Sequence, residues 1–239
     1  AQPLYHVDGQ ILDEVYEYGS FTQSRMFEQD VMCSDCHDSH SSKTIEPDNR
    51  LCLQCHRPDI YDTPKHHFHK MDPAVAGGQI MSQAIIFSGN VPGGRPADMG
   101  LQTYRASTDA GPLINRGEPK YVEGTGAQCV NCHMTGRYYM GNDYRRDHSY
   151  RIPRPDLTAK TGAPNACNDC HKDKSTSWSQ SYILKWYGER TRPHYGETFA
   201  AAEKGDRSVI SDLILYSENE LFPLMVRATA VRFLGRFNT

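Results

Sequence analysis

The sequence has no apolar run of about 18 residues, the length at which a stretch is read as a membrane-spanning helix. It also has little apolar material overall, since 38% of its 239 residues are hydrophobic and the mean hydropathy is −0.67. A core built from protein alone would be thin for a chain of this length. The formal net charge is −3 and no dense basic patch is present, so we expect no nucleic-acid partner.

No cysteine lies outside four copies of the pattern C-x-x-C-H. The cysteines are Cys33, Cys36, Cys52, Cys55, Cys129, Cys132, Cys167 and Cys170, and the histidines that follow them are His37, His56, His133 and His171. This pattern is typical of covalent c-type haem attachment, in which two thiols bond to the haem and the histidine ligates the iron. Four copies that use every cysteine predict four haem c groups, with these histidines as proximal ligands.

Zinc and disulfides are the alternative uses of eight cysteines. The 15 residues between Cys36 and Cys52 fit a zinc spacing, but the 34 residues between Cys132 and Cys167 do not. Zinc gives no reason for a histidine after each second cysteine. Four disulfides would explain the even count but neither the repeated two-residue gap nor the histidines. Haem explains all of these features.

Seven further histidines could supply the sixth ligand of each iron: His6, His40, His66, His67, His69, His148 and His194. His40 follows His37 by three residues, and within one helical turn both side chains point the same way. His40 therefore cannot reach the far face of the same haem, and we expect it to ligate a different one; the alternative is a surface histidine. His6 and His194 lie outside the haem-binding stretch. We expect them to be ordinary histidines, or to reach a haem of a neighbouring subunit.

Two more distal ligands are expected in the densest histidine cluster of the chain. His66 and His69 are three residues apart and are our preferred pair, with His67 as the alternate to His66. A separate metal site formed by the cluster is the other interpretation. His148 lies between the third and fourth attachment motifs and is expected to be a fourth distal ligand.

We divide the chain into residues 1–174, which carry the haem motifs, and a helical segment, 175–239. Residues 72–126 contain no cysteine or histidine and ten glycines, and are interpreted as an insertion that covers haem edges, contacts a partner or is merely decorative. Within the insertion, Gln79–Ser88 is a strand or short-helix candidate. Helices are expected over Trp178–Tyr187 and Thr198–Lys204.

A last helix is expected from near Pro223, because proline suits a first helical turn. Its apolar stripe is predicted to be Leu224, Ala228, Val231 and Leu234, which share one face at helical spacing. The C-terminal helices look like one unit of a helical repeat, which cannot bury its own face. The unit is therefore expected to pack on the haem-binding part or on a partner.

Several stretches carry a resemblance to a known group of proteins. They include Cys33–His40, His66–His69, Cys129–Met134, Arg145–Ser149, Pro153–Leu157 and Pro164–Cys167. On these stretches the chain resembles exported multihaem cytochromes of the group that includes the tetrahaem cytochrome of ammonia oxidisers. It is also similar to bacterial tetrahaem proteins that continue into tetratricopeptide or HEAT-like repeats. The resemblance implies a mostly α and coil fold organised by stacked haems, with little β structure, a C-terminal helical hairpin and bis-histidine irons.

Electron transfer is the function we expect, with redox proteins as partners, because iron held by two histidines has no open position for a substrate. The alternative is a multihaem oxidoreductase that acts on a small nitrogen or sulfur compound at a haem with an open site. Some chains of the resembled group polymerise outside the cell, so a homo-oligomer or haem-stacked filament is a third hypothesis. Covalent haem attachment takes place outside the cytoplasm, and Ala1-Gln2-Pro3 looks like a mature end, so we expect a periplasmic or extracellular protein.

Overall fold

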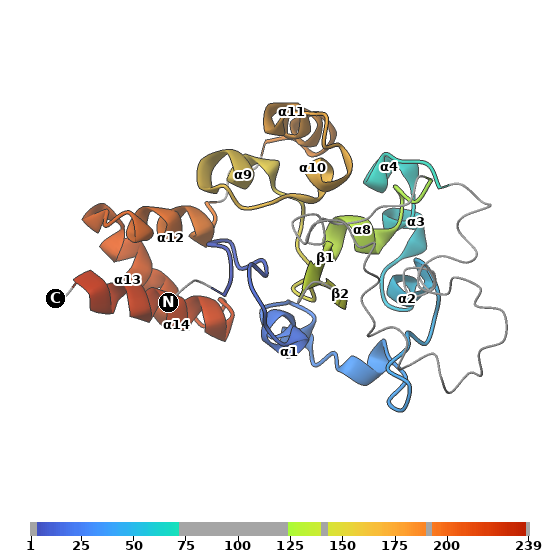
Figure 1. Ribbon diagram of the computed structural model, residues 1–239, viewed down its shortest axis with the longest axis horizontal. Helices are drawn as coiled ribbons and strands as arrows, with labels where there is room; N and C mark the ends of the chain where they lie inside the picture. The colour runs from blue at the N-terminus through green and yellow to red at the C-terminus, as the bar shows by residue number, and fades with distance from the viewer. Residues whose placement is uncertain (1–3, 72–123, 140–142, 190–192, 238–239) are drawn as a thin grey trace, which may run out of the picture.

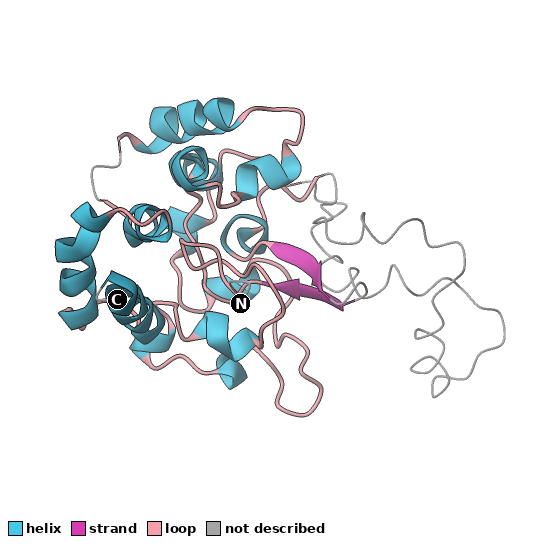
Figure 2. Ribbon diagram, turned by 60° about the vertical axis from the view of Figure 1, so that its left-hand side comes forward, coloured by secondary structure: helices cyan, strands magenta, loops and turns pink. Residues whose placement is uncertain are grey.

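The computed structural model describes residues 4–71, 124–139, 143–189 and 193–237. The described chain is mostly helical, with one small sheet, as Figures 1 and 2 show. The expectation of a mostly α and coil fold with little β structure is therefore confirmed. No helix among the described residues is long and apolar enough to cross a membrane. The insertion predicted at 72–126, with its strand or helix candidate, lies almost wholly outside the described residues.

Short helices separated by coil make up the part of the chain before residue 72 (Figure 1). They are α1 (Glu17–Phe21), the 3₁₀ turns η1 (Phe27–Gln29) and η2 (Cys33–Asp35), α2 (Arg50–Leu53), α3 (Pro58–Tyr61) and α4 (Pro64–His67). Proline is the first residue of both α3 and α4, where its missing N–H leaves no helical bond unmade. Phe68 ends α4 in the left-handed conformation, with φ of 54°. Each helix therefore spans little more than one turn.

The middle of the chain carries the sheet and three helices. They are α8 (Cys129–His133), β1 (Gly136–Tyr139), β2 (Asp143–Arg146), α9 (Pro155–Thr161) and α10 (Ala166–Cys170). The strands pair antiparallel, with Gly136 opposite Arg146, and form the magenta hairpin of Figure 2. Asn165 caps α10 by accepting a hydrogen bond from the Asn168 N–H. The short hairpin and the caps hold the third and fourth motifs on adjoining elements, since α8 and α10 are in contact.

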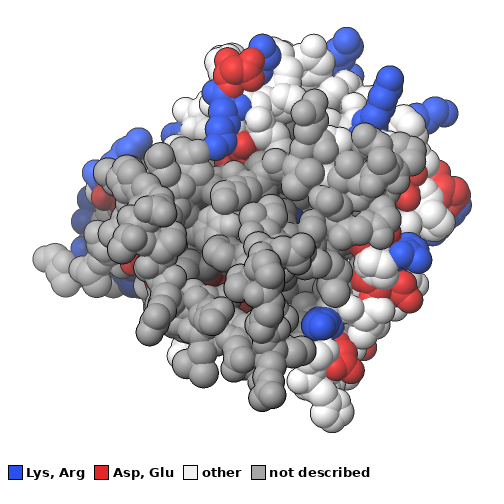
Figure 3. Space-filling model, turned by 45° about the vertical axis from the view of Figure 1, so that its right-hand side comes forward, with Lys and Arg blue, Asp and Glu red and all other residues white. Residues whose placement is uncertain are grey.

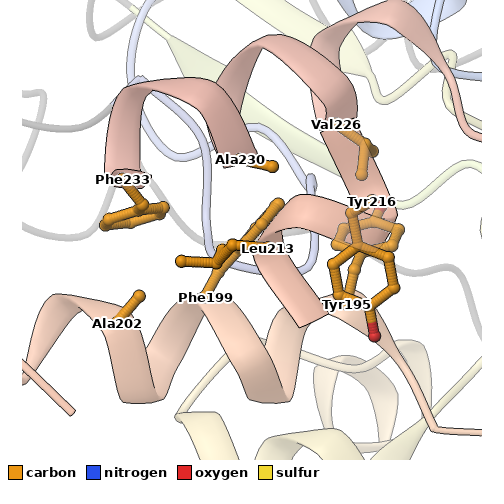
Figure 4. Packing of buried hydrophobic residues seen from close by; sticks show 8 residues of the cluster. All are labelled: Tyr195, Phe199, Ala202, Leu213, Tyr216, Val226, Ala230 and Phe233. Atoms are coloured by element: carbon orange, nitrogen blue, oxygen red, sulfur yellow. The ribbon is translucent and has the colours of Figure 1, made fainter. Parts of the chain in front are cut away.

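Longer helices follow in the C-terminal segment. They are α11 (Thr176–Tyr187), α12 (Tyr195–Glu203), the 3₁₀ turn η4 (Arg207–Val209), α13 (Ile210–Glu218) and α14 (Leu224–Phe237). The helices predicted over 178–187 and 198–204 and from near residue 223 are confirmed, with boundaries that shift by up to three residues. Figure 4 shows the buried cluster that joins the last three helices: Tyr195, Phe199, Ala202, Leu213, Tyr216, Val226, Ala230 and Phe233.

Of the predicted apolar stripe of α14, Leu234 packs against the buried cluster as expected, but the rest of the stripe is exposed and that part of the prediction is wrong. Leu224 and Val231 are 72% and 57% exposed, whereas Val226, Ala230 and Phe233 are the buried residues of the helix. Both sets have helical spacing, but they differ by two positions, or about 200° around the helix axis. The Phe233 ring, whose centroid lies 5.5 Å from that of Phe199, determines which set turns inward.

The C-terminal helices pack on the part of the chain that carries the motifs, as expected for a repeat-like unit. α12 contacts α9. The Tyr195 hydroxyl donates to the Asp8 carbonyl at 2.7 Å and accepts a hydrogen bond from Arg151 at 2.7 Å. Tyr195 is 8% exposed, so it fixes the N-terminal loop and the segment before α9 to the first turn of α12.

Replacing His194 tests a titratable cap of α12. Its Nδ1 accepts the Gly196 N–H at 3.0 Å, and burial and then Arg151 lower the pKa of His194 to about 4. Because the pKa of His194 is lower in the folded protein than in the unfolded chain, the unfolded chain binds an extra proton at low pH. The neutral His194 therefore contributes its full stabilisation above pH 6.5, and this contribution is lost as the pH falls toward 4. We expect His194→Asn to cap the helix without titrating.

In denaturant unfolding of the purified protein, the free energy of unfolding of wild type should fall by up to about 3 kcal/mol more than that of His194→Asn between pH 7 and pH 4. His194→Ala, the control, should be about 1 kcal/mol less stable than His194→Asn at every pH, because it removes the cap. Equal pH slopes for wild type and His194→Asn would show that His194 is not the titrating group.

Candidate metal centres

Each C-x-x-C-H motif forms one helical turn. The N–H of the histidine donates to the carbonyl of the first cysteine at 2.9 Å in the first motif, 3.0 Å in the second and 2.8 Å in the fourth, and α8 comprises the whole third motif. In such a turn, residues at positions 1, 4 and 5 lie on one side of the helix. The two thiols and the ring of each motif therefore project together, and none of the eight cysteines forms a disulfide.

Three of the four motif histidines face a second histidine from a distant part of the chain. The pairs are His37 with His148, His66 with His133, and His69 with His171. Their ring centroids are 6.2, 6.1 and 6.1 Å apart, although the partners are separated by 111, 67 and 102 positions in the sequence. Three unrelated pairs thus share one spacing.

This spacing is the one that a single metal ion between two imidazoles requires. A metal–imidazole nitrogen bond is about 2 Å and a ring centre lies about 1 Å behind its nitrogen, so two ligands on opposite sides of one ion have centres about 6.3 Å apart. A direct hydrogen bond between the rings would bring the centres to about 5 Å. The residues therefore fit an iron that is bound from both faces.

The second nitrogen of these rings has a hydrogen-bond acceptor in four cases, which leaves Nε2 free to ligate. The Nδ1 partners are the Ser42 carbonyl for His37, the Arg151 carbonyl for His133, the His67 carbonyl for His69, and Glu17 with the Arg146 carbonyl for His148. Metal-ligating histidines almost always donate their other N–H in this way, because the bond fixes the tautomer and the ring orientation. Burial also lowers the pKa of His133, which favours the neutral ring that a ligand must be.

His56 is the exception. It is exposed, and its ring contacts Tyr61 at 5.5 Å between centroids, edge to face. Among the described residues, which hold all eleven histidines, none is paired with His56 at the common spacing. His40, predicted to ligate a second haem, is exposed in the loop after η2, where its N–H donates to Asp38.

Of the remaining histidines, His67 and His194 have other roles. His67 Nδ1 accepts the His69 N–H at 3.2 Å, so its position helps to hold His69, and the geometry favours His66 and His69 over His67 as ligands. His194 caps α12. His6 is partly buried beside Asp8, and burial lowers its pKa. The structure therefore brings three of the predicted distal histidines, His66, His69 and His148, to motif histidines.

The four motifs are neighbours in chain order. Burial and, second, the nearby Cys52 raise the pKa of Cys36, so the first and second motifs lie close together. The neighbouring Cys52 thiol raises the pKa of Cys129, so the second and third motifs also lie close together. Burial and, second, the nearby Cys167 raise the pKa of Cys132 to about 11, so the third and fourth motifs lie close together. Groups attached to these thiols would form a continuous row.

Aromatic side chains that the sequence analysis did not assign surround the fourth motif. Trp178, Tyr182 and Trp186 recur every four residues on one face of α11, with centroids 4.7 and 5.2 Å apart. One end of this stripe meets His171 at 5.0 Å, and the other stacks on Phe68 at 4.4 Å, one residue from His69. The four-residue spacing is visible in the sequence, but its partners become evident only from the packing.

Gly126 is a second feature that the sequence analysis missed. A side chain there would bring its Cβ within 2.9 Å of the His69 ring, so glycine is required for the ring to lie where it does. A glycine three residues before the third motif is the only sequence signal, and it is weak. His69, which is paired with His171 of the fourth motif, thus packs against the chain that leads into the third motif.

The motif-bearing part has a small protein core of its own. Its buried hydrophobic side chains among the described residues are Ile11 and Phe21 before residue 72, and Ala127, Val130, Leu157, Ala163 and Ala166 between residues 124 and 174. Few of these side chains are large, and a bound apolar group at each motif would add apolar surface to this core. Among the described residues, no group of three or more His, Cys, Asp or Glu side chains is arranged to hold a metal ion.

Comparison with known proteins adds no relative. No protein-family model, curated protein or solved structure matches the chain. The interpretation of the metal centres therefore depends on the motifs, the histidine spacing and the hydrogen bonds described above.

Asn49 joins the second and third motifs and provides a test of their packing. It is 7% exposed; its amide donates to Asp62 at 2.8 Å and to the Ala127 carbonyl at 3.0 Å, and its oxygen accepts the Cys129 N–H at 2.9 Å. We expect Asn49→Ala to lower the free energy of unfolding by about 2–4 kcal/mol, because buried backbone groups lose their partners.

Denaturant unfolding of the purified protein measures this loss. Asp62→Ala is the matched control, since it removes the acceptor of one amide donation and keeps the bonds to Ala127 and Cys129, and it should fall between wild type and Asn49→Ala. A change below about 0.5 kcal/mol for Asn49→Ala would contradict the role given to this side chain.

Proposed function

We propose that this chain is a tetrahaem c-type cytochrome that transfers electrons. The observation that carries the proposal is the common spacing of three histidine pairs, each of which includes the histidine of a C-x-x-C-H motif. Each haem c would be attached through the two cysteines of one motif: Cys33 and Cys36, Cys52 and Cys55, Cys129 and Cys132, or Cys167 and Cys170. A haem supplies a one-electron ferric–ferrous couple when bound.

The chain's own residues would hold three irons from both faces. His37 and His148, His133 and His66, and His171 and His69 leave no open position between them, which favours an electron carrier over a catalyst. The Nδ1 acceptors hold four of these rings in one tautomer, so that the ligands do not have to reorient when the charge of the iron changes.

Contacts between motifs support transfer along a row. Cysteines of neighbouring motifs, from the first to the fourth, lie near enough for one to raise the pKa of the other. The Tyr61 ring lies 5.5 Å from His56 and 5.3 Å from His66, and so fills the space between ligands of the second and third centres. Attachment sites this close support direct exchange of electrons between neighbouring centres.

The fold that we propose is the stacked-haem arrangement of the multihaem cytochromes that the sequence resembles. Haem attachment and the resemblance support export to the periplasm or the extracellular space. Redox proteins are the partners that this function requires. Figure 3 shows both acidic and basic side chains on the part of this face that is not drawn in grey. Assembly into a haem-stacked filament follows from the resemblance alone.

Haem content tests the proposal most directly. The purified protein should contain four covalently bound haems per chain by the pyridine haemochrome assay. All of them should reduce with dithionite, and at least three should give low-spin ferric signals in electron paramagnetic resonance. Fewer than four haems, or bound zinc in their place, would contradict the proposal.

The histidine cluster allows a matched test of the distal ligands. We expect His69→Ala to convert one of the four haems to a high-spin form, because that iron loses its second ligand. His67→Asn is the control, since its side-chain oxygen can still accept the His69 N–H and its backbone carbonyl still accepts from His69 Nδ1, and its spectrum should match wild type. The same high-spin fraction in both variants would show that the pairing of His69 with His171 is not a ligand pair.

A second function, a reductase or oxidase of a small nitrogen or sulfur compound, is favoured by one observation. No histidine among the described residues is paired with His56, so the haem at Cys52 and Cys55 is the candidate for an open position. His40, the predicted ligand of a neighbouring haem, is the histidine of this chain that could close it.

Spectroscopy separates the two functions. If the site is open, wild type should show one high-spin haem in four that shifts when nitrite, hydroxylamine or sulfite is added. If His40 closes the site, wild type should be wholly low-spin and His40→Ala should generate the high-spin fraction. A high-spin fraction that disappears as the protein concentration rises would instead favour a ligand from a second copy of the chain.

A further inference from the structure

Glu17 accepts from a ligand ring in the function proposed above, but its negative charge has no role there. We propose that its carboxylate lowers the reduction potential of the haem attached at Cys33 and Cys36, by accepting the Nδ1–H of the distal ligand His148. This inference rests on the proposed function, since it needs an iron between His37 and His148.

α1 holds His148 at two points. Glu17 lies in the first turn of α1, and its Oε2 is 3.0 Å from His148 Nδ1. One turn later, the hydroxyl of Ser20, which is fully buried, accepts the His148 N–H at 3.2 Å. The contacts join residues separated by 131 and 128 positions. The ring and the backbone of His148 are therefore both positioned by one short helix.

Glu17 differs in charge from the acceptors on the other ligand rings. The Nδ1 partners of His37, His133 and His69 are all backbone carbonyls, which carry no net charge. His148 also meets a carbonyl, that of Arg146 at 2.8 Å, but it meets a carboxylate as well. Hydrogen bonds to ionised groups are roughly twice as strong as those between neutral groups. The first centre is thus the one, among the described ligands, with an anionic partner.

The Glu17 carboxylate lies where water screens its charge only in part. The His148 and Glu17 side chains are 22% and 34% exposed, and Glu17 Oε1 is buried with no hydrogen-bond partner among the described residues. Water therefore screens this charge less than it would at an exposed site. Arg145 is the nearby cation, and it is bonded to Asp143 at 2.7 Å and to the Val15 carbonyl, so it offsets the charge only in part.

The direction of the effect follows from charge. Reduction adds one electron to a ferric iron, breaks no bond and, in this proposal, moves no proton. A negative charge behind the ligand favours the more positive, ferric state, and a stronger Nδ1 hydrogen bond makes Nε2 a better donor to it. Both effects lower the reduction potential of the haem attached at Cys33 and Cys36.

Glu17→Gln tests the proposal, because it keeps the size of the side chain and a neutral acceptor but removes the charge. In a spectroelectrochemical titration of the haem-loaded protein, the reduced-to-oxidised ratio of one haem at a fixed potential should rise about tenfold, which is 59 mV upward for a one-electron couple. The other three haems should not shift. Glu14→Gln, the control, removes an exposed charge three residues away and should leave all four unchanged.

An unshifted or lowered potential in Glu17→Gln, or an equal shift in Glu14→Gln, would overturn the proposal. If Glu17→Gln does not assemble with four haems, Glu17→Asp serves instead. It keeps the charge one carbon further from His148, so the same haem should shift upward by a smaller amount, and no shift would again overturn the proposal. Absence of covalent haem from wild type would contradict the proposed function itself, whereas four haems with unshifted potentials would contradict only the role of Glu17.

Discussion

The motif-bearing part of this chain brings opposing histidines together in pairs at one common distance. A helical turn is enough to bring two thiols and one imidazole to the same side, and that local requirement is met four times. The second imidazole has to come from elsewhere, and three pairs bring it from at least 67 positions away. The long-range contacts of the motif-bearing part therefore converge on a distance that iron, rather than side-chain packing, requires.

Stability is consequently divided between two kinds of core. α12, α13 and α14 bury a cluster of aromatic and aliphatic side chains of the ordinary kind (Figure 4). Residues 4–71 bury Ile11 and Phe21, together with polar groups such as Asn49 and Ser20. For the motif-bearing part, binding of the prosthetic groups and folding would be one process, as they are in small metal-dependent domains. The Tyr195 and Arg151 bonds then join a segment with its own core to one that depends on its cofactors.

The sequence predicted what depends on local spacing. The attachment motifs, the helices of the C-terminal segment, and His66, His69 and His148 as candidate distal ligands all followed from short patterns. The partner of each histidine did not, because pairing depends on how distant segments approach. The buried face of α14 was predicted wrongly for a related reason. Two faces of that helix are apolar, and the packing of Phe233 against Phe199 determines which of them is buried. Glu17, Gly126 and the α11 aromatic stripe were missed because their roles exist only in contact with a ligand ring.

The left-handed backbone at Phe68 has a wider consequence. It ends α4 between His66 and His69, so that rings three residues apart turn toward two different motif histidines, His133 and His171. Phe68 itself stacks on Trp186, which anchors this bend to α11. This one bend in the backbone therefore positions histidines of two candidate metal centres. A shift of its backbone would alter both at once, so the chain cannot adjust either centre here independently of the other.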